Sequence, residues 1–256
     1  MMERSIAAAL AGNPYPGRGL LCGRSADGTR ALAAYFITGR SAASRGRILA
    51  RTEDGAATRA PGGPAGGDPA LLLYAAARRI PGALIAGNGS HTDLIAARLA
   101  AGGTLEEALS ACTFEPDAPH YTPRIALVLR AAGPSCALAI VRRGAAGACE
   151  RAVFPVPRLG PGEGYLLHTY AADGDPLPPF AGAPRALRLP DGGAAELLFA
   201  LWAALPAERR VAAYACALRV PDGAPLEERI VNAMEERTVS ASGERCAGAG
   251  KGGEPL

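Results

Sequence analysis

The segment Thr113–Ile125 reads TFEPDAPHYTPRI, and its last residue begins the apolar run IALVLRA at 125–131. Its three prolines fix their own φ angles and bias the preceding residues away from the helical conformation. The sequence therefore predicts a semi-rigid loop that leads into a buried strand. Such a loop could position polar side chains for chemistry, although an ordinary surface loop is the alternative. These side chains are Glu115, Asp117, His120, Tyr121 and Arg124.

Towards the N-terminus, GLLCGRS (19–25) and ALAAYFITGRS (31–41) are predicted to form an antiparallel hairpin. The dipeptide Asp27-Gly28 between them is a strong hairpin-turn signal. A short helix over 3–11 precedes this hairpin, and a strand over 47–52 follows it. The stretch 53–69 has little periodic apolar content and is predicted to be a mobile loop or hairpin tip. For 68–82 the pattern leaves helix and extended structure open.

Beyond a strand over 83–90, two helices are predicted at 92–102 and 105–113. Ser90 or Thr92 could cap the first, and Thr104 with Glu107 forms a capping box for the second. After the polar loop, strands are predicted over 125–131, 135–144, 151–157, 162–170 and 209–220. Two amphipathic helices complete the pattern, at 194–205 and 225–237.

Strands thus arrive in pairs, and so do helices, which favours an α+β fold over alternating βαβ units. We expect two mostly antiparallel sheets with outer helices, a layered αββα sandwich. Residues 1–237 are predicted to form one domain, and the small, polar segment 238–256 a disordered tail.

The composition of the 256 residues excludes several classes of protein. Hydrophobic residues make up 49% of the chain, enough for a sizeable core. A net charge of +3 is too small to indicate a nucleic-acid partner. No apolar run approaches the roughly 18 residues that span a membrane. The six cysteines lack C-x-x-C spacing. A cytoplasmic protein without nucleic-acid or membrane partners is predicted.

An anion site is predicted at TGRSAASRGR (38–47), because arginine forks, serine hydroxyls and glycine backbone suit a phosphate monoester. A solvated loop is the alternative. The turn Gly87-Asn88-Gly89 also favours a negative or carbonyl ligand, but it lacks the full dinucleotide-binding fingerprint. The three histidines have no metal-ligand spacing, so no metal is expected. The predicted substrate-binding residues are Arg18, Arg40, Ser41, Arg45, Arg47 and His168.

Several long motifs occur in a fixed order along the chain. They are NPYPGRG (13–19), AYFITGRSAASRGR (34–47), GNGSHTD (87–93), TFEPDAPHYTPRI and GEGYLLHTYAADGDPLPPF (162–180). In order and spacing they resemble the archaeal-type IMP cyclohydrolase family and its bacterial relatives, over roughly residues 10–235. The resemblance implies a four-layer αββα sandwich like that of the N-terminal-nucleophile hydrolases.

The resemblance also implies an activity, the dehydrative closure of 5-formamidoimidazole-4-carboxamide ribotide to IMP in purine biosynthesis, with no cofactor. Closure requires a proton shuttle, for which Glu115 or Asp93 is suited, and a proton donor to the formyl oxygen, for which Tyr121 is suited. Arg124 and Asn88 could stabilise the negative oxygen or orient the carboxamide. The 38–47 loop with Arg18 would hold the 5′-phosphate.

Two other functions fit the same expected fold. An amidohydrolase would need a freed N-terminal nucleophile, but Cys22 lies inside a predicted strand, so we expect no autocatalytic processing. A non-catalytic purine-nucleotide-binding regulator is the other alternative, and it would tolerate loss of Glu115, Tyr121 or Arg124, all of which are present. The expected partner is a small purine ribotide, and self-association into a homo-oligomer is left open.

Overall fold

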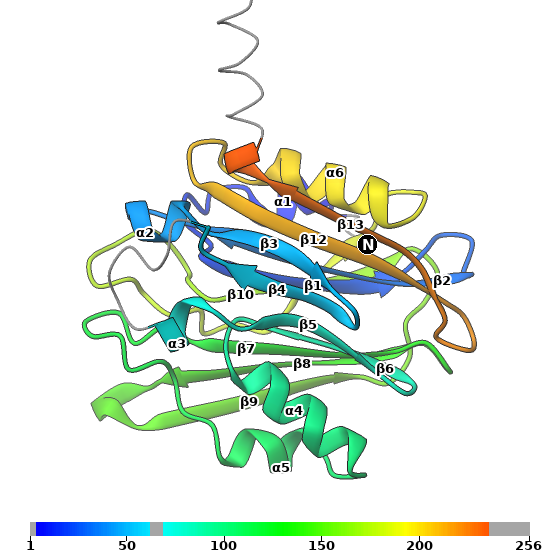
Figure 1. The fold of residues 1–256 in the computed structure, drawn as a ribbon, viewed down its shortest axis with the longest axis horizontal. Helices are drawn as coiled ribbons and strands as arrows, with labels where there is room; N and C mark the ends of the chain where they lie inside the picture. The colour runs from blue at the N-terminus through cyan, green and yellow to red at the C-terminus, as the bar shows by residue number, and fades with distance from the viewer. Residues whose placement is uncertain (1–3, 62–68, 236–256) are drawn as a thin grey trace, which may run out of the picture.

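The computed structural model describes residues 4–61 and 69–235, and its strands form two antiparallel sheets (Figure 1). The six-stranded sheet contains β1 (Arg18–Arg24), β2 (Arg30–Thr38), β10 (Glu163–His168), β11 (Arg185–Arg188), β12 (Arg210–Arg219) and β13 (Pro225–Asn232). The seven-stranded sheet contains β3 (Ile48–Thr52), β4 (Gly55–Arg59), β5 (Ala75–Ile80), β6 (Ala83–Gly87), β7 (Arg124–Arg130), β8 (Ser135–Arg143) and β9 (Cys149–Val156). The spatial orders are β11-β10-β1-β2-β12-β13 and β3-β4-β5-β6-β7-β8-β9.

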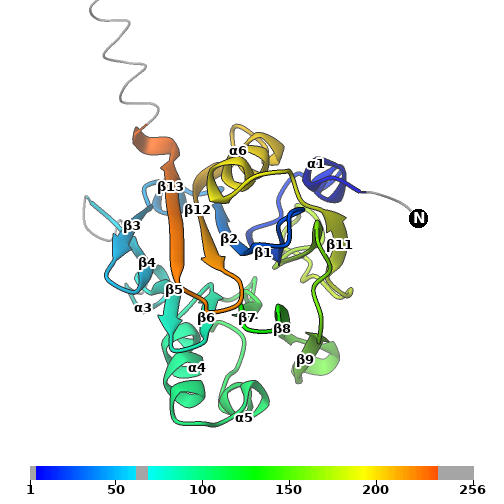
Figure 2. The same ribbon diagram turned by 90° about the vertical axis from the view of Figure 1, so that its right-hand side faces the viewer.

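Besides the helical residues 233–235, the described ranges contain six α-helices and one 3₁₀ turn. They are α1 (Ile6–Leu10), α2 (Ala42–Arg45), α3 (Pro69–Leu72), α4 (His91–Ala100), α5 (Leu105–Ser110), α6 (Ala194–Ala204) and η1 (Ala145–Gly147). Figure 2 shows α1 and α6 on the outer face of the six-stranded sheet, and α4 and α5 on the far side of the seven-stranded sheet. Within residues 4–61 and 69–235, no helix is long and apolar enough to cross a membrane.

Three hydrophobic clusters fill the spaces between these layers. The largest lies between the two sheets and includes Leu20 and Cys22 of β1 with Leu127 of β7. The neighbouring Leu21 points the other way, into the cluster beneath α1 and α6, as strand alternation requires. A third cluster joins the seven-stranded sheet to α4 and α5. The two sheets therefore pack against each other through one face, and the opposite face of each packs against helices.

Much of the predicted local structure is confirmed. β1 and β2 pair as the expected antiparallel hairpin. The capping box at α5 is present, because Thr104 accepts from the Glu107 N–H while the Glu107 carboxylate accepts from the Thr104 N–H. Ser90 occupies the N-cap position of α4, but its side chain makes no capping hydrogen bond. The undecided stretch 68–82 contains both α3 and β5.

Other predictions were wrong or incomplete. The expected loop over 53–69 contains β4, a short strand that pairs with both β3 and β5. β11 was not predicted, because four residues with one buried side chain give almost no pattern. The helix predicted over 225–237 is instead the edge strand β13 over most of its length, with a short helical turn only at residues 233–235. The expected tail at 238–256 lies outside the described residues.

β13 is a strand because it completes contacts with both sheets. It pairs with β12 along its length, and a proline at its first position is tolerated in an edge strand. Glu228 accepts a hydrogen bond from the Tyr214 hydroxyl of β12 at 2.7 Å and forms an ion pair with Arg79 of β5. These tertiary contacts outweigh the helical spacing of its apolar residues.

Asn232 links the edges of the two sheets. Its side chain is buried and pairs with both backbone groups of Leu49 in β3: Oδ1 accepts from the Leu49 N–H at 2.9 Å, and Nδ2 donates to the Leu49 carbonyl at 3.1 Å. We expect Asn232→Ala to lower the free energy of unfolding by about 2–4 kcal/mol, because both Leu49 groups lose their partner inside the protein. Urea denaturation measures this change.

The matched control is Arg229→Ala, which removes an exposed side chain from the same strand. It should cost less than about 1 kcal/mol, as surface ion pairs do. Equal losses in the two variants would show that the link between the sheets does not depend on Asn232.

Candidate active site

The loop between α5 and β7 is held in shape by its own polar groups. The Glu115 N–H donates to the Thr122 carbonyl at 2.9 Å, and Asp117 accepts from the Thr122 N–H at 2.6 Å. The Thr122 hydroxyl bonds Asp117 and lies 2.6 Å from the Tyr170 hydroxyl. The loop predicted from its prolines is therefore ordered by hydrogen bonds, and it carries Glu115 into the protein.

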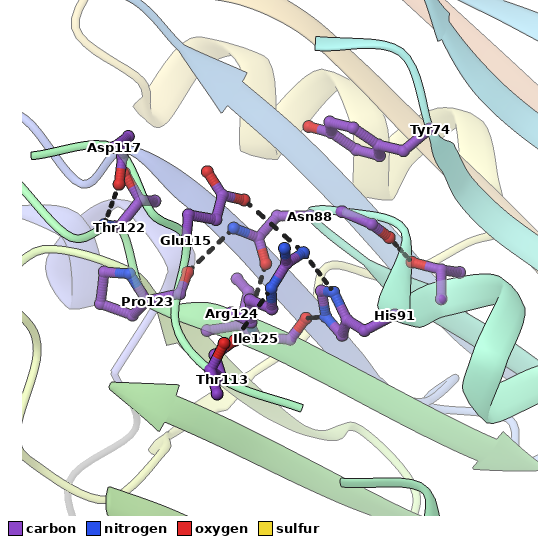
Figure 3. Close-up of polar contacts among 12 residues, drawn as sticks. Tyr74, Asn88, His91, Thr113, Glu115, Asp117, Thr122, Pro123, Arg124 and Ile125 are labelled. Carbon is purple, nitrogen blue, oxygen red and sulfur yellow. Dashed lines mark hydrogen bonds and ion pairs between the residues drawn. The ribbon is translucent and has the colours of Figure 1, made fainter. Parts of the chain in front are cut away.

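Arg124 is the centre of the polar contacts drawn in Figure 3. Its Nε donates to the Thr113 carbonyl at 3.0 Å, and its Nη1 lies 3.3 Å from Nδ1 of His91. The same Nη1 lies 4.0 Å from Oε1 of Glu115, beyond hydrogen-bond range. We refer to Asn88, His91, Glu115 and Arg124 as the Arg124 group.

Asn88 connects the end of β6 to the start of β7. Its Nδ2 donates to the Pro123 carbonyl at 2.9 Å, and its Oδ1 accepts from the Ile125 N–H at 2.7 Å. The side chain is buried and continues the ladder between the strands where β6 has ended. It thereby fixes the backbone on both sides of Arg124.

Gly89 leaves the space that Arg124 occupies. A Cβ at this position would lie 2.2 Å from Nη1 of Arg124 and 3.4 Å from Oε1 of Glu115. Any larger residue would displace the guanidinium. The Gly87-Asn88-Gly89 turn is therefore more than a tight turn, since it shapes the space around an arginine.

The environment of Glu115 changes its acidity. Burial raises the pKa of Glu115 to about 7, although the charges of Arg124 and Arg18 act to lower it. Only 7% of the residue is exposed. A carboxyl group with a pKa near neutrality can both accept and return a proton, which suits general acid–base chemistry.

A second set of polar side chains lies between the sheets, within electrostatic reach of Glu115. Arg47 is 1% exposed, and its Nη1 and Nη2 have no hydrogen-bond partner. Arg18 donates from Nη1 to the Thr38 carbonyl at 3.1 Å. The hydroxyls of Tyr35 and Tyr74 lie 2.7 Å apart. We refer to Arg18, Tyr35, Arg47 and Tyr74 as the arginine–tyrosine cluster.

Arg47 is unusual because a buried guanidinium normally has hydrogen-bond acceptors around it. Burial lowers its pKa, and the nearby charge of Arg18 lowers it further. Two cations thus share an interior whose nearest carboxyl group, Glu115, is only partly ionised at neutral pH. An anionic ligand would supply the acceptors that Arg47 lacks.

Several predicted site residues lie outside both groups. Arg40 donates from Nη1 to Asp173 and to the Gly174 carbonyl, each at 2.8 Å, and lies over the ring of Tyr15. The Ser41 hydroxyl caps α2 by accepting from the Ser44 N–H, and Arg45 is exposed in the last turn of that helix. Of the three arginines in the predicted anion loop (38–47), Arg47 alone is therefore buried in the interior.

The remaining candidates are also separate from Arg124. Asp93 is exposed on α4 and pairs with Arg78 at 2.7 Å. His168 is buried, packs against the ring of Phe180 at a tilted angle, and has one ring nitrogen within hydrogen-bond distance of the Tyr170 carbonyl. The Tyr121 ring packs edge-on against Phe114, under the guanidinium of Arg143.

Sequence reasoning missed three members of these groups. Tyr35 and Tyr74 sit in apolar runs, where an aromatic residue normally means core packing. His91 is a lone histidine in a motif. Its position two residues after the Gly87-Asn88-Gly89 turn was the available signal. Across 4–61 and 69–235, no three His, Cys, Asp or Glu side chains gather as metal ligands.

Comparisons with known proteins agree in their result. A family model described as IMP cyclohydrolase-like protein matches residues 15–222, which include both polar groups. The chain is also similar to a protein named IMP cyclohydrolase from Methanopyrus kandleri. The two are 38% identical over 160 residues, which make up 61% of this chain and 75% of that relative.

Proposed function

The chain belongs to the IMP cyclohydrolase-like protein family, and on that premise we propose that it closes 5-formamidoimidazole-4-carboxamide ribotide to IMP, with loss of water. The resemblance found in the ordered motifs is confirmed by this membership. The structural observation that carries the proposal is the half-buried guanidinium of Arg124 lying 4.0 Å from the buried carboxyl group of Glu115, within electrostatic reach of Arg47, whose Nη1 and Nη2 lack partners.

The reaction makes three demands on the protein. The carboxamide nitrogen must lose a proton as it attacks the formyl carbon. The formyl oxygen develops negative charge and takes up a proton to become a hydroxyl. This hydroxyl must then leave as water with a second proton, while the formamido nitrogen gives up its own proton as the C=N bond of the ring forms. Glu115 can carry a proton from nitrogen to oxygen in each of the two steps, first from the carboxamide to the formyl oxygen and then from the formamido nitrogen to the leaving hydroxyl, because its pKa is about 7. The fixed guanidinium of Arg124 can stabilise the developing charge.

The arginine–tyrosine cluster suits the anionic part of the ribotide. Arg47 has two free nitrogens in a buried setting, and Arg18 adds a second positive charge close by. We assign phosphate binding to these two residues. The roles first predicted for Arg40, Ser41, Arg45, His168, Asp93 and Tyr121 stay predictions, and Asn88 is assigned to fixing the backbone around Arg124.

The order of the layers, helices, sheet, sheet and helices, supports a relation to the N-terminal-nucleophile hydrolase fold. We propose that residues 1–237 form one domain of this kind. An amidohydrolase of that fold is less well supported, because Cys22 is fully buried in the middle of β1 and burial raises the pKa of its thiol. A cytoplasmic location, the absence of a cofactor and of nucleic-acid partners, and self-association stay predictions from the sequence.

Turnover tests the proposal directly. Purified protein incubated with the formamido ribotide should form IMP, followed by ultraviolet absorbance. Micromolar binding of IMP without turnover would instead support the non-catalytic regulator. Absence of both binding and turnover would refute the proposed function.

The pH dependence of the reaction should report on Glu115. Because the carboxylate form removes the proton, kcat/KM should rise as pH increases through about 7, the pKa to which burial raises Glu115 in the free enzyme. Steady-state rates from pH 5 to 9 measure this. In Glu115→Gln the rise near pH 7 should disappear together with most of the activity, and a variant that kept the same profile would exclude Glu115 as the titrating group.

A further inference from the structure

His91 begins α4 and is 3% exposed. Its Nε2 lies 2.9 Å from the carbonyl oxygen of Ile125. A carbonyl oxygen only accepts, so Nε2 must carry a proton. Burial lowers the pKa of His91 to about 4, and the charge of Arg124 acts in the same direction. At neutral pH the ring therefore has one proton, on Nε2, and a lone pair on Nδ1.

The lone pair on Nδ1 faces Arg124, whose Nη1 lies 3.3 Å away. A guanidinium only donates, so this contact fits the tautomer set by Ile125. The other end of the guanidinium is held by the Thr113 carbonyl through Nε. Contacts at both ends fix the plane of Arg124, with Gly89 leaving the necessary space. Nη1 then lies beside Glu115 without bonding it, at 4.0 Å.

We propose that His91 is a positioning residue for ring closure: its Nε2–H tautomer accepts a hydrogen bond from Arg124 and holds the guanidinium in line with Glu115 and the reacting formyl group. This inference rests on the proposed function for its catalytic meaning. It assigns His91 no contact with the substrate. The orientation itself is a property of the free protein and can be measured without turnover.

A purely structural role is the competing explanation. In that case the important bond is Nε2–H to Ile125, which attaches α4 to β7, and Nδ1 contributes nothing. The two explanations can be distinguished by experiment, because they depend on different nitrogens of the His91 ring. Asparagine places its amide near the Nδ1 position, and glutamine places its amide near the Nε2 position.

The test compares His91→Asn with His91→Gln. The asparagine carbonyl can still accept from Arg124, whereas the glutamine amide can still donate to Ile125. We expect His91→Gln to keep thermal stability but to lower kcat about 10²-fold, since misplacing a catalytic group by about 1 Å costs that much. His91→Asn should lose stability yet retain kcat within about tenfold of the parent. The reverse order, or equal losses of kcat, would overturn the proposal.

A spectroscopic measurement separates this inference from the proposed function. The chain has three histidines, so their ¹⁵N imidazole signals can be assigned with single substitutions. We expect His91 to show a protonated Nε2 and an unprotonated Nδ1 at pH 7, and Arg124→Ala to shift the Nδ1 signal. A proton on Nδ1 would overturn the positioning role. If the parent protein shows the expected tautomer but does not convert the formamido ribotide, the proposed function is refuted and the His91–Arg124 contact is still supported.

Discussion

Replacing Arg124 by alanine is expected to lower kcat by about 10²–10³-fold while the protein stays folded, as loss of a fixed donor to a developing oxyanion does in other enzymes. The side chain is held at Nε by Thr113 and at Nη1 by His91, so no reorganisation is needed when charge develops. Thr113 and His91 do not belong to the hydrophobic clusters, so losing their contacts with Arg124 should lower the stability of the protein only slightly. Steady-state kinetics together with thermal denaturation measure both effects.

Arg130→Ala is the matched control for this variant. Arg124 and Arg130 are the first and last residues of the same strand, β7, and Arg130 is exposed. Its replacement should leave kcat near that of the parent. Arg124→Lys tests geometry further, because an ammonium keeps the charge but cannot reproduce the two-ended attachment of the guanidinium. Full activity of Arg124→Ala would contradict the assigned role.

Replacing Arg47 by methionine is expected to weaken IMP binding and yet to stabilise the free protein. Both terminal nitrogens of Arg47 are buried without partners, so the unliganded fold bears the cost of a desolvated charge. Replacing buried ion pairs by apolar side chains of similar volume often stabilises a protein by about 1–4 kcal/mol, and we expect a gain of the same order here. Loss of a hydrogen bond to a charged group should reduce affinity by about 10- to 150-fold, or about 1.5–3 kcal/mol.

Calorimetric titration with IMP and thermal denaturation with and without IMP measure the two opposite effects. Arg59→Met is the control, because Arg59 is exposed at the end of β4 and outside both polar groups. It should change neither the affinity nor the Tm by much. A lower Tm for Arg47→Met with unchanged affinity would show that Arg47 is a structural residue.

The elements that could be predicted are those whose structure depends on neighbouring residues alone. The Asp27-Gly28 hairpin, the Thr104–Glu107 capping box and the proline-braced loop follow from rules that act over a few residues, and all three are present. β13 was misread as a helix because Glu228 and Asn232 make their decisive contacts with distant strands. No local pattern contains that information.

The same distinction explains the site. Glu115 and Arg124 were found because one short loop carries both. The arginines of the 38–47 loop were predicted as a set, but only the structure separates Arg47, which is buried, from Arg45, which is exposed two residues earlier. Tyr74 could not be found, because it reaches the interior from an apolar stretch and meets Tyr35 across the two sheets.

A crystal structure of the complex with IMP tests the central claim most directly. That claim is that the ribotide binds between the sheets, with an anionic group against Arg47 and Arg18 and the ring beside Arg124 and Glu115. We expect Nη1 and Nη2 of Arg47 to lie within hydrogen-bond distance of the ligand, and Arg124 to contact the six-membered ring. IMP bound elsewhere on the molecule, with Nη1 and Nη2 of Arg47 still lacking partners, would contradict it.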